Sequence, residues 1–287
     1  MDFFLSYIIL AEIYILLALS TNLLVGITGI FSVSQAAVFG VGAYVCSSLT
    51  LNEGWPFGVA LLAAIVCCVV INVLLSLPSL RVSGDYFIVT SFGIQFLCTA
   101  VFENWSSATG GTSGLPGIPT PQIFGLHTEE PAYFVWMSTF ALIIGCLCFQ
   151  LVLRSPFGRL LGAIREDEIA VAAIGRNVLR GKINAAALSG AYSGVAGSLY
   201  GAFLSFIDPS SFDMQASILL VSMVVVGGAR TMAGSIIGPA FLIGLPQLLA
   251  FVNISSSIAG PLRQLVYGVL LVVFMLFRPS GLAGKRL

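Results

Sequence analysis

Few residues in this sequence have the types and spacing that catalysis or metal binding requires. The only histidine, His127, lies beside Glu129 and Glu130 in a loop, which is too small a ligand set for a metal site. All six cysteines lie within apolar runs, with neither the spacing of a redox motif nor a nearby histidine. We therefore expect no metal or other cofactor, and we interpret the cysteines as small apolar side chains.

Two glycine-rich stretches could cradle phosphate by composition, but neither completes a nucleotide-binding motif. Thr109–Pro119 is rich in Gly, Thr, Ser and Pro, and residues 227–234 read GGARTMAG. A Walker-type loop needs Lys and then Ser or Thr after its last glycine, and both stretches lack this pair. The sequence therefore predicts that the chain is not an enzyme and does not hydrolyse nucleotide itself.

The composition is that of a polytopic membrane protein. Hydrophobic residues make up 58% of the chain and charged residues only 8%, whereas about a quarter of the residues in a soluble domain are charged. The net charge is zero, and no basic tract occurs outside residues 154–182. We therefore expect membrane lipid around most of the chain and no nucleic-acid partner.

Nine apolar windows approach the length of about 20 residues that crosses the hydrocarbon core. Their approximate limits are residues 4–26, 33–50, 57–77, 86–102, 132–153, 183–206, 215–228, 233–251 and 261–277. The first window has no basic segment before it, which favours a membrane span over a cleaved signal peptide. We predict an all-α fold, with residues 1–287 forming a single transmembrane helix bundle of about 8–10 spans, nine being the count proposed.

Residues 154–182 form the one long charge-dense segment, with six of the twelve Lys and Arg residues and three of the twelve acids. One such charge costs about 2.5–3.5 kcal/mol in hydrocarbon, so the segment must be an aqueous loop. If this loop is cytoplasmic, the alternation of spans places eleven of the twelve basic residues inside and only Arg263 outside. This bias predicts an outer N-terminus, a cytoplasmic C-terminus and an outer Gly- and Pro-rich loop at residues 103–131.

A helix is predicted to begin inside the charged loop. Ser155 can accept a backbone N–H hydrogen bond, and Pro156 suits the first helical position. The apolar residues that follow recur on one helical face, at Phe157, Leu160, Leu161 and Ile164. Such a helix either lies on its own protein or docks a cytoplasmic partner.

Polar residues within two apolar windows are further candidates for function. Glu12 either lies at the outer membrane interface or is an intramembrane acid, which would be a functional residue by default. The run from Gly26 to Tyr44 is rich in glycine and contains Ser32, Ser34 and Gln35. This run either packs closely against other helices or lines a permeation route.

Five stretches in the same order and spacing resemble LivM-type permease subunits of ABC importers for branched-chain amino acids. They are NLLVGITGIFSVSQAAVFGVGAYV, GDYFIVTSFGIQFL, TGGTSGLPGIP, SPFGRLLGAIREDEIAVAAIG and LFRPSGLAG. The resemblance extends from about Asn22 to Gly284, and GRLLGAIREDEIAVAAIG is its most specific part.

The resemblance implies a permease in a bacterial or archaeal plasma (inner) membrane. Its implied partners are a second, related permease, two cytoplasmic ATPase subunits and an extracytoplasmic substrate-binding protein. On this resemblance, residues 154–182 are the coupling loop that an ATPase moves, through Arg159, Arg165, Glu166, Asp167 and Glu168.

A zwitterionic substrate needs polar groups along an otherwise apolar path. The residues expected to provide them are Ser32, Ser34, Gln35, Asn104, Thr109, Gly110 and Gly111. Gln35 stands where similar permeases often have His, and Ile30 and Phe31 replace a polar-led pair. Permeases for urea or short-chain amides share the same framework and are an alternative.

Two other classes of membrane protein are weaker alternatives. An ion-coupled secondary transporter would need ionisable residues within its spans, and Glu12 is the one candidate in this sequence. A passive channel or scaffold would need no ATPase partner. Co-purification with ATPase subunits and a binding protein separates these alternatives from the importer.

Overall fold

The apolar windows of the sequence fold as helices. The computed structural model describes residues 2–80, 85–123, 126–127, 131–250, 265, 268–269, 272 and 281–284. The longer helices are α1 (Asp2–Thr21), α2 (Gln35–Asn52), α3 (Phe57–Ser76), α4 (Asp85–Asn104), α6 (Pro131–Arg154), α7 (Pro156–Glu166), α9 (Val178–Leu204), α10 (Met214–Gly227) and α11 (Met232–Ala250). The all-α fold class is thereby confirmed.

Short elements connect or extend these helices. The π-helix η1 (Asn22–Thr28) continues α1, and the others are η2 (Leu77–Leu80), α5 (Ser106–Thr109), η3 (Gly111–Ser113), β1 (Leu115–Pro116), β2 (Gln122–Ile123), β3 (Leu126–His127), α8 (Glu168–Ala173), β4 (Phe206–Ile207) and η4 (Pro209–Phe212). Strand β1 pairs antiparallel with β4, with Leu115 opposite Ile207, and β2 pairs antiparallel with β3.

Each of the first eight apolar windows contains a helix, whereas residues 261–277 lie largely outside the described residues. Within the described ranges, four segments are long and apolar enough to cross a membrane: Phe4–Thr28, Phe57–Ser76, Tyr86–Asn104 and Tyr133–Arg154. Two shorter apolar helices are Met214–Gly227 and Met232–Gly244. The count of nine spans stays a prediction.

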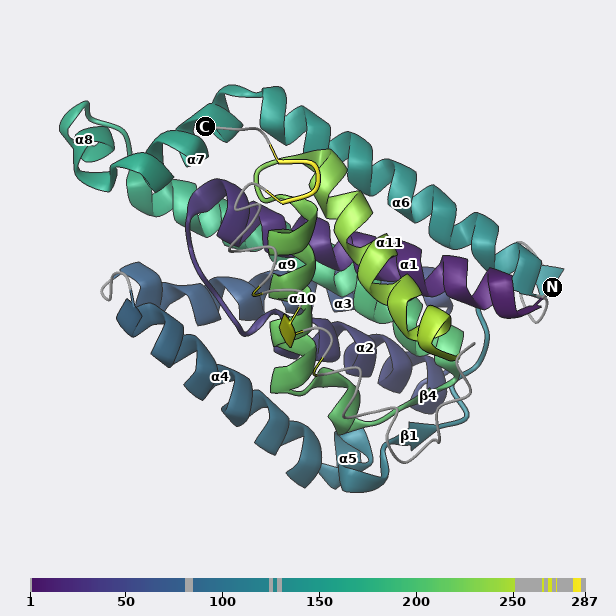
Figure 1. Cartoon of the computed structure of the whole chain (residues 1–287). Coiled ribbons are helices and arrows are strands. Elements are labelled where there is room, and N and C mark those ends of the chain that lie inside the picture. Colours follow the sequence, from purple (N-terminus) through teal and green to yellow (C-terminus); the bar gives the residue numbers. More distant parts are fainter. Residues whose placement is uncertain are drawn as a thin grey trace.

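Helix α9 packs against α1, α2 and α3 and holds the bundle together (Figure 1). Its glycines allow this close approach: a Cβ on Gly190 would lie 2.6 Å from the carbonyl oxygen of Cys68, and one on Gly194 would lie 2.9 Å from the Cα of Ile65. The small residues of α9 are therefore used for tight helix packing within the chain.

Gly197→Ala is expected to destabilise the chain because its new methyl group has no space. The added Cβ would lie 2.4 Å from the carbonyl oxygen of Phe39 and 2.7 Å from the backbone nitrogen of Ala43. Overpacking of this kind costs about 1–3 kcal/mol, which should lower the Tm of the detergent-purified chain. Gly93→Ala is the control, since a Cβ there meets nothing within 4 Å. Equal Tm values for the two variants would contradict this packing.

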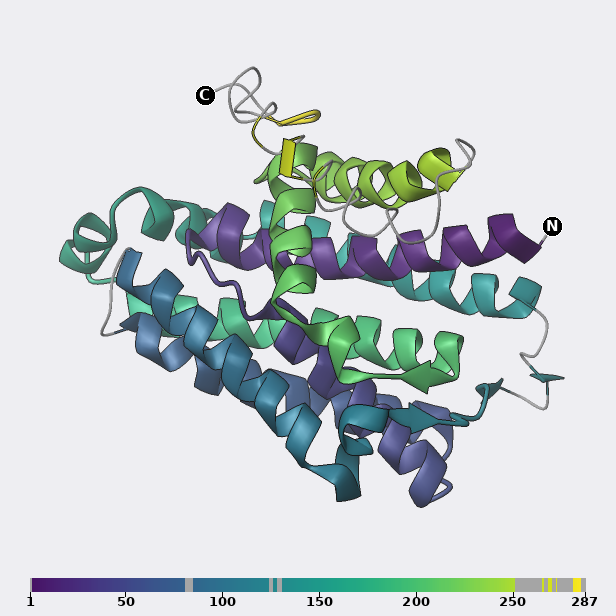
Figure 2. The same cartoon turned by 60° about the horizontal axis from the view of Figure 1, so that its bottom comes forward.

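The charged loop of residues 154–182 and the Gly- and Pro-rich loop that follows α4 lie at opposite ends of the bundle. Figures 1 and 2 show α7 and α8 at one end, and the first turn of α1 together with β1 and β4 at the other. Helix α10 crosses the long helices steeply in both views and ends near α7. This arrangement separates the loop of residues 154–182 from the strands that follow Gly114.

Candidate functional site

The helix predicted inside the charged loop is α7, and its predicted start is confirmed. Ser155 Oγ accepts a hydrogen bond from the Gly158 backbone N–H at 3.1 Å, and Pro156 follows at the first helical position. Leu161 and Ile164 are buried against the rest of the chain. The apolar face of this helix therefore packs on its own protein, and a partner would meet other residues of the loop.

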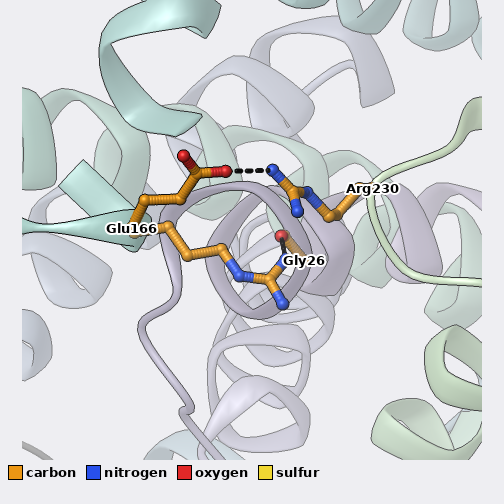
Figure 3. A network of polar contacts seen from close by, with 4 residues as sticks. Gly26, Glu166 and Arg230 are labelled. Atoms are coloured by element: carbon orange, nitrogen blue, oxygen red, sulfur yellow. Dashed lines mark hydrogen bonds and ion pairs between the residues drawn. The ribbon is translucent and has the colours of Figure 1, made fainter. Parts of the chain in front are cut away.

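The charged residues predicted for coupling mostly stabilise the loop itself. The Arg165 guanidinium donates to the carbonyl oxygen of Gly26, and Glu166 forms an ion pair with Arg230 at 3.2 Å (Figure 3). Glu168 pairs with Lys182. These three side chains thus connect α7 and α8 to η1, to the turn before α11 and to α9.

The other two predicted coupling residues differ in their surroundings. Asp167 caps α8, since its Oδ1 accepts hydrogen bonds from the backbone N–H groups of Ile169 at 2.8 Å and Ala170 at 3.0 Å. Arg159 is exposed on α7. It is the one of the five side chains that faces outward without a hydrogen bond or ion pair among the described residues.

The surface that the loop presents is apolar at two residues that sequence reasoning missed. Ile169 is 83% exposed and Ile174 is 75% exposed, while Val171 between them is buried. Two exposed isoleucines form a small apolar surface, which makes this part of the loop a candidate contact for another protein. A signal was present in the sequence, because EIAVAAIG is an apolar run directly after the charges.

The ion pair of Glu166 continues into the π-helix η1. The backbone N–H of Arg230 donates to Asn22 Oδ1 at 2.9 Å, and Asn22 Nδ2 donates to the Thr231 carbonyl at 3.1 Å and to Ser235 Oγ at 2.7 Å. Burial lowers the pKa of Arg165, and the neighbouring Arg230 lowers it further, while Glu166 raises it. A guanidinium stays charged nonetheless, so Arg165 meets the Gly26 carbonyl as a cation.

A break of irregular backbone separates η1 from α2. Gly29, with φ of +77°, ends η1, and α2 begins only at Gln35. Ser91 Oγ on α4 accepts from the Val33 N–H at 3.1 Å. Ser32 and Ser34 share a hydrogen bond of 2.9 Å, and both are buried. The glycine-rich run is therefore a broken helix and not a continuous packed one.

The first turn of α2 is held by side chains from other helices. Ser217 Oγ on α10 accepts from the Ala36 N–H, and Gln95 Oε1 on α4 accepts from the Ala37 N–H, each at 3.1 Å. Gln95 Nε2 also donates to the Phe212 carbonyl at 2.7 Å. Sequence reasoning missed these partners, although polar residues within apolar windows are the signal for them.

Gln35 lies in a buried cluster with three serines. Its Nε2 donates to Ser189 Oγ at 2.9 Å, and its Oε1 accepts from Ser193 Oγ at 3.2 Å and from Ser20 Oγ at 3.5 Å. Ser20 Oγ lies 2.9 Å from the hydroxyls of both other serines. This cluster connects α1, α2 and α9 in the middle of the bundle.

The predicted path residues of the outer loop form a separate group. Asn104 is exposed at the end of α4, and its Nδ2 donates to the Ala100 carbonyl at 2.8 Å. Thr109 is buried, and its Oγ1 lies within hydrogen-bonding distance of the Phe102 carbonyl at 2.6 Å. Gly110 and Gly111 have positive φ angles of 72° and 63°. They form the turn that follows α5.

Glu12 is buried within the bundle and is only 8% exposed. Thr139 Oγ1 donates to Glu12 Oε1 at 2.6 Å, and Ser138 Oγ donates to Glu12 Oε2, both from α6. Glu12 therefore joins α1 to α6.

An apolar cavity of ≈ 630 Å³ lies between α1, α3, α6 and α9. Its lining includes Leu16, Phe57, Phe140, Ile144 and Tyr192. None of the seven path residues predicted from the sequence is part of the lining. The cavity and the polar clusters are thus distinct features of the bundle.

Comparisons with known proteins agree with this architecture. A family model described as "Branched-chain amino acid transport system / permease component" matches residues 3–275. The chain is 29% identical to the high-affinity branched-chain amino acid transport system permease protein LivM of Escherichia coli (strain K12), over 95% of this chain and 68% of that protein.

More distant relatives extend the comparison. A probable LivM of Methanocaldococcus jannaschii is 28% identical over 80% of this chain and 69% of its own length. The permease protein LivH of Escherichia coli (strain K12) is 23% identical over 96% of this chain and 92% of its own length. No solved structure matches the chain. The chain belongs to the family of permease components of branched-chain amino acid transport systems.

Proposed function

We propose that this permease forms, with a second permease of related sequence, the translocation path of an ABC importer for branched-chain or other hydrophobic amino acids. Two separate ATPase subunits bind the loop of residues 154–182 from the cytoplasm, and an extracytoplasmic binding protein delivers the substrate. The exposed Ile169 and Ile174, on a loop in which Arg165, Glu166 and Glu168 pair within the chain, are the observation that supports this proposal most. Such a surface suits an apolar groove on a partner.

The proposed orientation places α7 and α8 in the cytoplasm of a bacterial or archaeal cell. Arg230, which the positive-inside rule also assigns to the cytoplasm, contacts Glu166 in that loop. The outer end then carries β1, β4 and the turn around Gly110, where a binding protein would release its substrate. The two ends lie where an importer needs them.

The proposed path follows the break between η1 and α2. Gly29 and Phe31 are exposed within this break, whereas Ser32 and Ser34 are buried just behind them. Irregular backbone at membrane depth is tolerated where protein or a water-filled route surrounds it. We assign Ser32, Ser34 and Gln35 to the inner wall of the path and the segment 104–111 to its outer mouth.

The experiment that tests this function is uptake by the assembled importer. The chain is co-expressed with its neighbouring permease, ATPase and binding-protein genes, purified as a complex and reconstituted into liposomes. Labelled leucine should accumulate only with ATP and the binding protein. Urea and acetamide, tested in parallel, should not accumulate. Leucine uptake that persists without ATP would contradict the proposal.

Glu12→Gln is expected to leave uptake within about twofold of the unsubstituted importer, because a neutral side chain fits this site. Ser138 Oγ also lies 3.0 Å from the Val135 carbonyl, and a hydroxyl has a single hydrogen to donate. A glutamine amide can donate to Ser138 Oγ while its oxygen accepts from Thr139.

The control at the same residue is Glu12→Leu, which removes both contacts with α6 and should lower the Tm. Loss of uptake in Glu12→Gln with an unchanged Tm would instead favour the ion-coupled transporter, in which this carboxylate carries the coupling ion.

A further inference from the structure

The side chain of Arg165 leaves the loop and lies along the end of η1. A Cβ placed on Gly29 would be 2.7 Å from Arg165 Cγ and 3.2 Å from Arg165 Cβ. The aliphatic part of this arginine therefore crosses Gly29, and its guanidinium reaches the Gly26 carbonyl one turn earlier. Gly29 also needs its positive φ of +77° to end the helix. Both requirements exclude a side chain at residue 29.

The Gly26 carbonyl is a favourable acceptor for a cation. It belongs to the last turn of η1, where carbonyl oxygens lack a following helical turn and carry the negative end of the helix dipole. A Cβ on Gly26 would lie 1.8 Å from Asn22 Oδ1 and 3.0 Å from the Arg230 backbone nitrogen. The two glycines thus let Arg165 and the Arg230 turn approach η1 from different sides.

The next residue of α7 makes a second connection to the same π-helix. Glu166 pairs with the Arg230 side chain, whose backbone N–H is bonded to Asn22 at the start of η1. Figure 3 shows the Glu166 carboxylate directed at Arg230 beside Gly26. The end of α7 therefore holds both ends of η1, and the break that leads to α2 begins directly after it. π-Helical turns are frequent at functional sites.

We propose that Arg165 is a positioning residue that transmits movement of α7 to η1 and so to the break at residues 29–34. This inference rests on the proposed function, since it assumes that an ATPase displaces α7. A charged donor on a backbone carbonyl and a side chain packed on a glycine make a short, stiff connection. The Glu166–Arg230 pair, whose side chains are both exposed, keeps α7 aligned while Arg165, which contacts η1 directly, carries the displacement.

The test uses the reconstituted full importer, with the native cysteines of this chain replaced by alanine and an environment-sensitive fluorophore on Phe31→Cys, an exposed residue within the break. Without a further substitution, ATP should change the fluorescence, and each ATP hydrolysed should yield a constant amount of uptake. Arg165→Met keeps the aliphatic contact with Gly29 but removes the guanidinium. It should abolish the ATP-dependent fluorescence change and lower uptake per ATP at least about tenfold, the factor that a loss of about 1.4 kcal/mol gives.

Two further variants separate transmission from stability. Arg165→Lys keeps a cationic donor and should recover part of the coupling, while ATP hydrolysis in both variants stays near that of the parent because α8 is unchanged. Gly93→Ala, which lies outside residues 154–182 and where a Cβ meets nothing within 4 Å, should couple as the parent does. A Tm for Arg165→Met equal to that of Gly93→Ala would exclude misfolding as the cause.

The outcomes of these experiments distinguish the proposed role of Arg165 from the proposed importer function. If the parent importer takes up leucine with ATP and Arg165→Met does so with equal coupling, the assignment to Arg165 is wrong while the importer function stands. A second outcome also contradicts the assignment. In that outcome Arg165→Met lowers both the Tm and the uptake per ATP, and Arg165→Lys restores the Tm but not the uptake per ATP. If the parent shows no ATP-dependent uptake, the proposed function fails, and the assignment fails with it.

Discussion

Replacing Ile169 and Ile174 together with aspartate is expected to abolish ATP-driven uptake while the chain remains folded. Both side chains are largely exposed in the isolated chain, so an acidic residue meets no packing there. In the assembled importer they would be buried against an ATPase subunit, where each contributes about 1.5–3 kcal/mol. Losing both, and adding two charges, should weaken ATPase binding at least about a hundredfold.

The measurement is ATPase retention on the purified permease pair, followed by uptake in liposomes. The control variant carries Ile169→Leu and Ile174→Leu, which keeps the apolar surface and should retain both the ATPase and the uptake. An aspartate variant that binds the ATPase normally would show that the partner contacts other residues, with the exposed Arg159 as the next candidate.

Gln35→Leu is expected to destabilise the contact between α2 and α9. The side chain is nearly isosteric but leaves Ser189 and Ser193 without their shared amide partner. Hydrogen bonds between membrane helices average about 0.6 kcal/mol and reach about 1.7 kcal/mol. Two such contacts therefore contribute about 1–3 kcal/mol, and their loss should lower the Tm of the purified chain clearly.

Ser222→Ala is the matched control for this substitution. Ser222 is also a buried polar residue, but its hydroxyl donates to the Ile218 carbonyl of its own helix at 2.8 Å. Removing it should change the Tm little, because the carbonyl keeps its helical hydrogen bond. Similar Tm values for Gln35→Leu and Ser222→Ala would show that the Gln35 cluster does not hold α1, α2 and α9 together.

The sequence was sufficient to predict the features that depend on local chemistry. Charge density alone separates residues 154–182 from the apolar helices around them, and the Ser155–Pro156 pair marks the start of α7 correctly. Apolar windows locate the helices because burial in lipid or protein demands the same residue types. The glycines from Gly26 to Gly42 were compatible with either close helix packing or a broken helix, and only the structure places a break between Gly29 and Gln35.

The roles of individual charged residues could not be predicted, because their partners are far away in the sequence. Arg165 and the Gly26 carbonyl are 139 residues apart, and Glu166 and Arg230 are 64 apart. Charge suggested an outward-facing contact surface, whereas the fold uses these groups as internal connections. Ile169 and Ile174 were overlooked because the sequence alone does not show whether an apolar residue in a polar loop is buried or exposed. Ser91 and Gln95 are four residues apart on one face of α4, and only the fold shows that they meet the start of α2.

Residues 154–182 are proposed to face the cytoplasm and to present Ile174 to an ATPase. Both parts of this proposal are tested by the reaction of Ile174→Cys, in a background whose native cysteines are replaced by alanine, with a membrane-impermeant maleimide. Inside-out vesicles stripped of ATPase should be labelled, right-side-out vesicles should not, and rebinding the ATPase should protect the cysteine. Labelling from the outside of intact cells would contradict the orientation, and labelling unaffected by bound ATPase would contradict the contact.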